Sequence, residues 1–252
     1  MCCFASNLLF DKFRQNSTFF THWLYITTVQ ETEKYPYATA GDDVKTTLTE
    51  EQYNGLPDYL KKSAWLYGIP NVEECENSNK NRAVTASHFI PNFAAFEYYV
   101  AGDFEQDRNV CMPTAVANCL SYFDSLGRSG LISGSRMSQA EFTELCNACE
   151  WTSSYSPTLT QGANGLYRYC RARSYTATDF SHTFNLWTNI KSNLDNDYPV
   201  LVAEPGHADF CTGYKVENGN HLLYIYTGNV DMPVAWLDFN ECVSGFDRIW
   251  IS

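Results

Sequence analysis

The sequence predicts an α+β fold in which a helical part precedes an antiparallel β-sheet. Two patterns in the second half of the chain indicate this order. Between residues 111 and 195, apolar residues recur at helical intervals of three and four; after residue 199 the period changes to two, as in strands. Because the helices come first and the strands follow as a run, an antiparallel sheet is expected, not a doubly wound one.

Length and composition limit the kinds of protein that this chain could be. The chain of 252 residues is long enough for one large domain, or for a catalytic domain with a smaller companion. Its net charge of −12 argues against nucleic acid or an anionic membrane as the main partner, because both bind basic faces. No apolar run approaches the ~20 residues of a membrane-spanning helix, so no membrane span is expected.

The chain has ten cysteines, and their arrangement indicates in which cellular compartment the protein is found and whether it holds a metal. The start MCCFASNLLF has no basic residue before its apolar stretch, which argues against a secretory signal. A reducing, cytoplasmic compartment with free thiols is therefore favoured, while secretion stays open if a signal has been removed. Cys146 and Cys149 form a single CxxC without a second ligand pair, so core packing is expected there, and no metal or cofactor.

Residues 1–95 are expected to form an N-terminal extension of mixed structure. The aromatic and Thr-rich start is strand-like to about residue 50, and TLTEEQYNGLPDYLKKSAWLYGI is typical of a capped helix broken near Gly55 and Pro57. The polar segment ECENSNKNR at 74–82 is linker-like, which places a boundary between it and about residue 95. The extension could be a pro-segment, a recognition region or a structural addition.

Residues 96–252 are expected to form the catalytic domain. Its first helix, CMPTAVANCLSYFDSLG, begins at Cys111, accommodates Pro113 in its first turn and ends at Gly127. Further helices are expected at about 138–149, after Gly162, and over FNLWTNIKSNLDN. Strands are expected at 199–204, 207–216, 221–227 and 246–251, with the turn ENGN between the second and the third.

Four residues are candidates for a thiol-dependent reaction. Cys111 is the candidate nucleophile, because a helix start and a nearby imidazolium both favour thiolate. Gln106, five residues earlier, can bring its carboxamide beside the Cys111 N–H, which gives two donors for an oxyanion. His207, at the start of a strand after a Gly turn, is the candidate base, and Asn229, at the end of YIYTGN, is the candidate that orients its ring.

These motifs resemble those of a known family. DRNVCMPTAVANCLSYF, PGHADFCTGY and YIYTGN are similar, in this order, to the Cys, His and Asn/Asp motifs of the C39-like, double-glycine-peptidase branch of papain-like cysteine peptidases. The resemblance covers about residues 96–252. It implies a papain-like fold and a catalytic site made of Cys111, His207, Asn229 and Gln106.

The sequence departs from the family pattern at three points. Met112 stands where the family usually has Gly, which adds bulk beside the nucleophile. Asp209 follows His207 by two residues and, on a strand, faces the same way, so its carboxylate would favour an imidazolium or draw the ring aside. The third catalytic residue is open, because strand parity also allows Thr227 or Asp231 to face the site.

The expected function is that of a thiol hydrolase that cleaves a peptide or isopeptide bond in a protein or peptide substrate. One alternative keeps the same dyad in an acyltransferase or amidase. Another is a catalytically inactive papain-like binding module, with the N-terminal extension as its interaction part.

Overall fold

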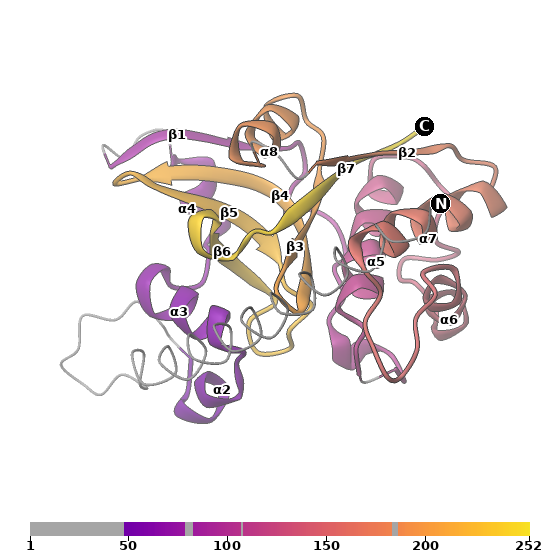
Figure 1. Cartoon of the computed structure of the whole chain (residues 1–252). Coiled ribbons are helices and arrows are strands. Elements are labelled where there is room, and N and C mark those ends of the chain that lie inside the picture. Colours follow the sequence, from indigo (N-terminus) through magenta and orange to yellow (C-terminus); the bar gives the residue numbers. More distant parts are fainter. Residues whose placement is uncertain (1–47, 79–82, 107, 183–185) are drawn as a thin grey trace, which may run out of the picture.

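A computed structural model describes residues 48–78, 83–106, 108–182 and 186–252 (Figure 1). The strand-like start expected before about residue 50 lies almost wholly outside these residues. In chain order the elements are α2 (Glu50–Gly55), α3 (Asp58–Tyr67), α4 (Val72–Glu76), β1 (Val84–Phe89), η2 (Ala101–Asp103), α5 (Cys111–Ser125), α6 (Gln139–Ala148), α7 (Leu159–Ala172), β2 (Ala177–His182), α8 (Leu186–Asp195), β3 (Val200–Glu204), β4 (His207–Glu217), β5 (Asn220–Tyr226), β6 (Val234–Asp238), α9 (Phe239–Cys242) and β7 (Gly245–Ile251).

The α+β class expected from the sequence is confirmed. The described strands form one sheet in the order β2-β7-β3-β4-β5-β6, with β1 paired to β4, and all of these pairings are antiparallel. The turn between β4 and β5 consists of Asn218 and Gly219, both with positive φ, as a two-residue hairpin requires. Strands β1, β2 and β6 are not among the four strands expected at 199–204, 207–216, 221–227 and 246–251.

Helix α5 packs against both the sheet and the helices α6 and α7. Its residues from Met112 to Phe123 are all buried, and it packs against β4 (Figure 1). Gly127 follows it with φ of 90°, the left-handed conformation in which a helix commonly ends. The predicted helices around residues 138–149 and after Gly162 are α6 and α7; α7 begins earlier than expected because Thr158 and Gln161 form a capping box.

The described part of the N-terminal extension shares the core of the rest of the chain. The expected helix break is present, since α2 ends at Gly55 and α3 begins after Pro57. On α3, Tyr67 donates a hydrogen bond to the Asp238 carboxylate over 2.9 Å, and β1 pairs with β4. One hydrophobic cluster runs from Leu48 to the last strand, so the boundary expected before residue 95 separates no second core within the described residues.

No helix in the described part of the chain is long and apolar enough to cross a membrane.

Candidate active site

Cys111 is the first residue of α5, where the backbone N–H groups of the first turn have no partner within the helix. Its Sγ lies 3.0 Å from the Ser156 hydroxyl oxygen. Burial disfavours the thiolate, but the hydrogen bond with His207, the charge of His207 and the bond with Ser156 together lower the pKa of Cys111. The surroundings of Cys111 therefore favour ionisation of its thiol.

The other described cysteines behave differently. Burial raises the pKa of the six whose side chains the structure describes, to about 12 for Cys75, Cys146, Cys170 and Cys211 and further still for Cys119 and Cys149. Both thiols of the CxxC are buried, as expected for core packing. Within the described residues, no group of three or more His, Cys, Asp or Glu side chains is arranged to hold a metal ion.

His207 begins β4, and the hydrogen bonds of its ring fix the tautomer. Its Nε2 lies 2.9 Å from the carbonyl oxygen of Thr227. A backbone carbonyl can only accept, so Nε2 carries a proton, and Nδ1 is the nitrogen left to interact with the Cys111 thiol. The ring of Tyr59, from α3, lies 5.2 Å from the His207 ring between centroids, so the N-terminal extension reaches the site.

Asp209 supplies the charge beside this ring. Its Oδ1 lies 3.3 Å from His207 Nε2, and the side chain is fully buried. Burial of the imidazole lowers the pKa of His207, but the charge and hydrogen bond of Asp209 outweigh it, with a smaller contribution from Cys111, and raise this pKa to about 12. An imidazolium is thus favoured beside the Cys111 thiol, whose own pKa is lowered. The ring is not drawn away from the thiol, because Asp209 sits at its other nitrogen.

Among the described residues, the carboxamide of Asn229 makes no hydrogen bond with the His207 ring. Its Oδ1 accepts from the backbone N–H groups of Asp231 and Met232, at 2.9 and 3.2 Å, in a turn that follows β5. The Asn229 N–H donates to the Thr227 hydroxyl over 2.9 Å. Asn229 lines the cleft and closes the loop that presents the Thr227 carbonyl, while the contacts expected of the orienting residue are made by Thr227 and Asp209.

Gln106 also points elsewhere. Its Nε2 donates to the Thr143 hydroxyl over 3.1 Å, and its Oε1 accepts from Gln139 over 2.8 Å, so α6 holds its carboxamide. Gln106 is not among the residues that line the cleft. Asn109 does line it, with its Nδ2 donating to the Ser153 carbonyl over 2.9 Å. The oxyanion geometry expected for Gln106 is therefore absent from this arrangement of its side chain.

The cleft extends to both sides of the thiol. Two adjoining hollows of about 420 and about 450 Å³ both include Cys111, Ser156 and His207 in their walls. The first is bounded further by the loop 227–231, and the second by the loop 154–158 and the end of β3. Gly206 lies between them with φ of 80°, a conformation that glycine adopts without strain. Cys111 therefore has open space on both sides.

Met112 is one of the residues that line the second hollow. Its side chain is buried, and its sulfur lies too close to Gly162 of α7 for a Cβ to be added there. The absence of a side chain at Gly162 therefore makes room for the residue that departs from the family pattern.

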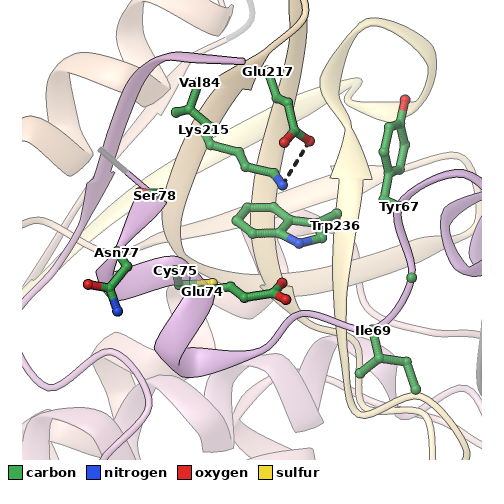
Figure 2. A pocket seen from close by; sticks show the side chains of 11 residues that line it. Tyr67, Ile69, Glu74, Cys75, Asn77, Ser78, Val84, Lys215, Glu217 and Trp236 are labelled. Carbon is green, nitrogen blue, oxygen red and sulfur yellow. Dashed lines mark ion pairs between the residues drawn. The ribbon is translucent and has the colours of Figure 1, made fainter. Parts of the chain in front are cut away.

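A separate hollow of about 710 Å³ lies between the α3–α4 region and the sheet (Figure 2). Lys215 pairs with Glu217 over 3.0 Å and stands over the indole of Trp236, with 4.4 Å to the ring centroid. The thiol in this wall is Cys75, which is buried and has a raised pKa. None of the residues that line this hollow lines the cleft at Cys111.

Comparison with known proteins assigns the chain to a family. The model described as the peptidase C39-like family matches residues 90–229, more than half of the chain. The chain belongs to the peptidase C39-like family. The matched range contains Cys111, His207 and Asp209 and ends at Asn229, so the family assignment expected from the motifs is confirmed.

Two solved structures resemble this C39-like chain. One is UfSP from C. elegans, with 10% sequence identity and a TM-score of 0.45; the similarity covers 71% of this chain and 37% of that one. The other is the peptidase domain of Streptococcus ComA, with 14% identity and a TM-score of 0.38, covering 57% of this chain and 91% of that one. No curated protein matches the chain.

The sequence interpretation missed two parts of the site. Ser156 lies in a polar loop, SSYSP, without a pattern that distinguishes it from any surface turn. The Thr227 contact comes from a backbone carbonyl, which has no signature in the side-chain sequence. The alternation of β4 did place Asp209 and His207 on one face, and that relation is confirmed.

Proposed function

We propose that this protein is a cysteine hydrolase that cleaves a peptide or isopeptide bond, with Cys111 as nucleophile and His207 as general acid and base. The observation that carries the proposal is the thiol of lowered pKa beside an imidazole of raised pKa, in the wall of an open cleft. Family membership agrees with this chemistry.

The proposed reaction begins with attack of the Cys111 thiolate on the substrate carbonyl carbon. The negative oxygen that develops would be stabilised by the Cys111 N–H and by a side-chain amide. Asn109 lines the cleft and is our choice for this donor; Gln106 would have to leave α6 first. His207 then donates its Nδ1 proton to the leaving amine, and in the second half accepts a proton from the water that releases the acyl group.

The proposed orienting groups are Asp209 and the Thr227 carbonyl, in place of the Asn229 carboxamide. Both lie at Nε2, which directs Nδ1 to the thiol, and the carboxylate stabilises the imidazolium. Asn229 contributes by holding the loop from Thr227 to Met232. The proposed role of the described part of the N-terminal extension is structural, since Tyr59 packs on the His207 ring.

A thiol-directed probe tests the proposal. A peptidyl vinyl sulfone, followed by peptide mapping in a mass spectrometer, should modify Cys111 and leave the other cysteines unmodified. Cys111→Ala should abolish the modification, and His207→Ala should slow it strongly, because the imidazolium favours the thiolate.

Turnover is then measured with a mixture of peptides and with an isopeptide-linked substrate. Cleavage that depends on both Cys111 and His207 supports a hydrolase. Modification of Cys111 without hydrolysis, but with transfer of the acyl group to an added amine, would point to an acyltransferase. An unreactive Cys111 would contradict both.

A further inference from the structure

Glu204, the last residue of β3, is a buried acid next to the candidate site. Its side chain is only 6% exposed, and the residue lies in the wall of the cleft together with Cys111 and His207. Carboxyl groups are rarely buried to this extent unless a partner compensates for the lost hydration.

The register of the sheet explains which groups surround Glu204. In the antiparallel pair of β3 and β4, Glu204 lies opposite His207, and Val202 lies opposite Asp209. Opposite residues of such a pair share a face, and so do residues two apart on one strand. The side chains of Glu204, His207 and Asp209 therefore lie on one face, with Asp209 diagonal to Glu204.

These two carboxyl groups have few other partners. Glu204 Oε1 and both carboxylate oxygens of Asp209 are buried and have no other hydrogen-bond partner of good geometry among the described residues. The titratable groups that face Glu204 are Asp209 and His207 of β4 and Cys111 of α5. Burial first, and then the charge and the hydrogen bond of Asp209, raise the pKa of Glu204 well above its usual value.

We propose that Glu204 is a positioning residue that, as a neutral carboxylic acid, donates a hydrogen bond to the Asp209 carboxylate and so keeps Asp209 directed at His207. The proposal rests on the proposed function, because it concerns the charge state of the same Cys111–His207 pair. The proton shared by the two acids leaves one negative charge beside the imidazolium. A second negative charge there would oppose formation of the Cys111 thiolate, which Glu204 also faces.

Two substitutions separate this role from simple packing. Glu204→Gln keeps a donor of the same shape, since the carboxamide N–H can donate to Asp209. Glu204→Leu keeps most of the volume and removes the donor. Val200→Ala is the packing control, because Val200 is a buried residue on the same face of the same strand, four residues away from Glu204.

The measurement is the rate of iodoacetamide alkylation at Cys111 between pH 5 and pH 9, resolved by peptide mapping, together with peptide turnover. Glu204→Gln and Val200→Ala should keep the pH midpoint of the parent. In Glu204→Leu, Asp209 loses its donor and supports the imidazolium less, so the midpoint should rise by about one unit, which is a tenfold slower reaction at pH 6.

The infrared carbonyl band of a protonated carboxylic acid gives a second readout that does not need activity. The band should be present in the parent at neutral pH and lost in Glu204→Gln. Absence of this band in the parent, or a Glu204→Leu midpoint equal to that of a reactive parent, overturns the inference and leaves the proposed function standing. If the proposed function itself is wrong, Cys111 of the parent is unreactive at pH 6 and the parent protein turns over no substrate. That result overturns both the proposed function and this inference.

Discussion

Asp209→Asn gives the most direct test of the charge arrangement at the site. The carboxylate oxygen lies 3.3 Å from His207 Nε2, and the substitution removes its charge while it preserves shape. With an effective dielectric constant of ~20, two unit charges at this separation interact by roughly 5 kcal/mol. Since one pH unit corresponds to about 1.4 kcal/mol, the pKa of His207 should fall by about three to four units.

The expected result is a change in the pH profile. In the parent, Asp209 raises the pKa of His207 to about 12, so the imidazolium persists throughout the neutral and moderately alkaline range. In Asp209→Asn, the imidazolium should be lost at a pH about three to four units lower, so kcat/KM should change by no more than about twofold at pH 8 and fall by about 10–10²-fold at pH 10. The Thr227 carbonyl still holds Nε2, which should preserve part of the activity.

The raised pKa of His207 also determines how the stability of the fold depends on pH. The folded pKa of His207 lies above its unfolded value, so the ion pair stabilises the fold fully below about pH 6.5 and its contribution is lost as pH rises toward 12. Asp209→Asn should therefore lower the melting temperature more at pH 6 than at pH 10.

The assay is peptide turnover and Cys111 alkylation from pH 5 to pH 10, with Asp231→Asn as the matched control. Asp231 also lines the cleft, and the His207 ring has its contacts with Asp209 and Thr227 instead. An unchanged alkaline limb in Asp209→Asn, or an equal shift in Asp231→Asn, would refute the assignment of Asp209.

Three further predictions follow from other contacts of the site and the core. Asn109→Ala should lower kcat by about 10²–10³-fold, the scale of one oxyanion donor, and Gln106→Ala by less; the reverse order in steady-state kinetics would return the role to Gln106. Asn229→Ala should lower kcat by about tenfold, because the loop loses its turn, without moving the pH profile; a shifted alkaline limb would show that Asn229 orients the ring itself. Gly165→Ala should destabilise the fold by about 1–3 kcal/mol in chemical denaturation, because a Cβ there would lie 2.8 Å from backbone atoms of Cys149. Gly130→Ala serves as the comparison: Gly130 has open space around it and a positive φ, so this variant measures the cost of the positive φ without a close contact.

Local signals were enough to predict several elements of the fold. The helix from Cys111 to Ser125 has a helical apolar period and a following Gly127, and both features act within a few residues. The turn of Asn218 and Gly219 likewise specifies the hairpin of β4 and β5 through its own backbone preferences. The alternation of β4 placed Asp209 beside His207 in the same way.

The sequence by itself therefore determined the helices α5 to α8, the strands β3, β4, β5 and β7, the family, and the elements that carry Cys111 and His207. Tertiary structure alone decided which groups touch these two residues. Gln106 could reach back to the thiol by its spacing, but Gln139 and Thr143, more than 30 residues away, hold its carboxamide. Strand parity allowed Thr227, Asn229 or Asp231 at the imidazole, and the contact went to a backbone carbonyl that every residue type possesses. The physical reason is that capping, turns and alternation are local interactions, whereas the partner of a buried polar group depends on which distant segments the fold brings within about 3 Å.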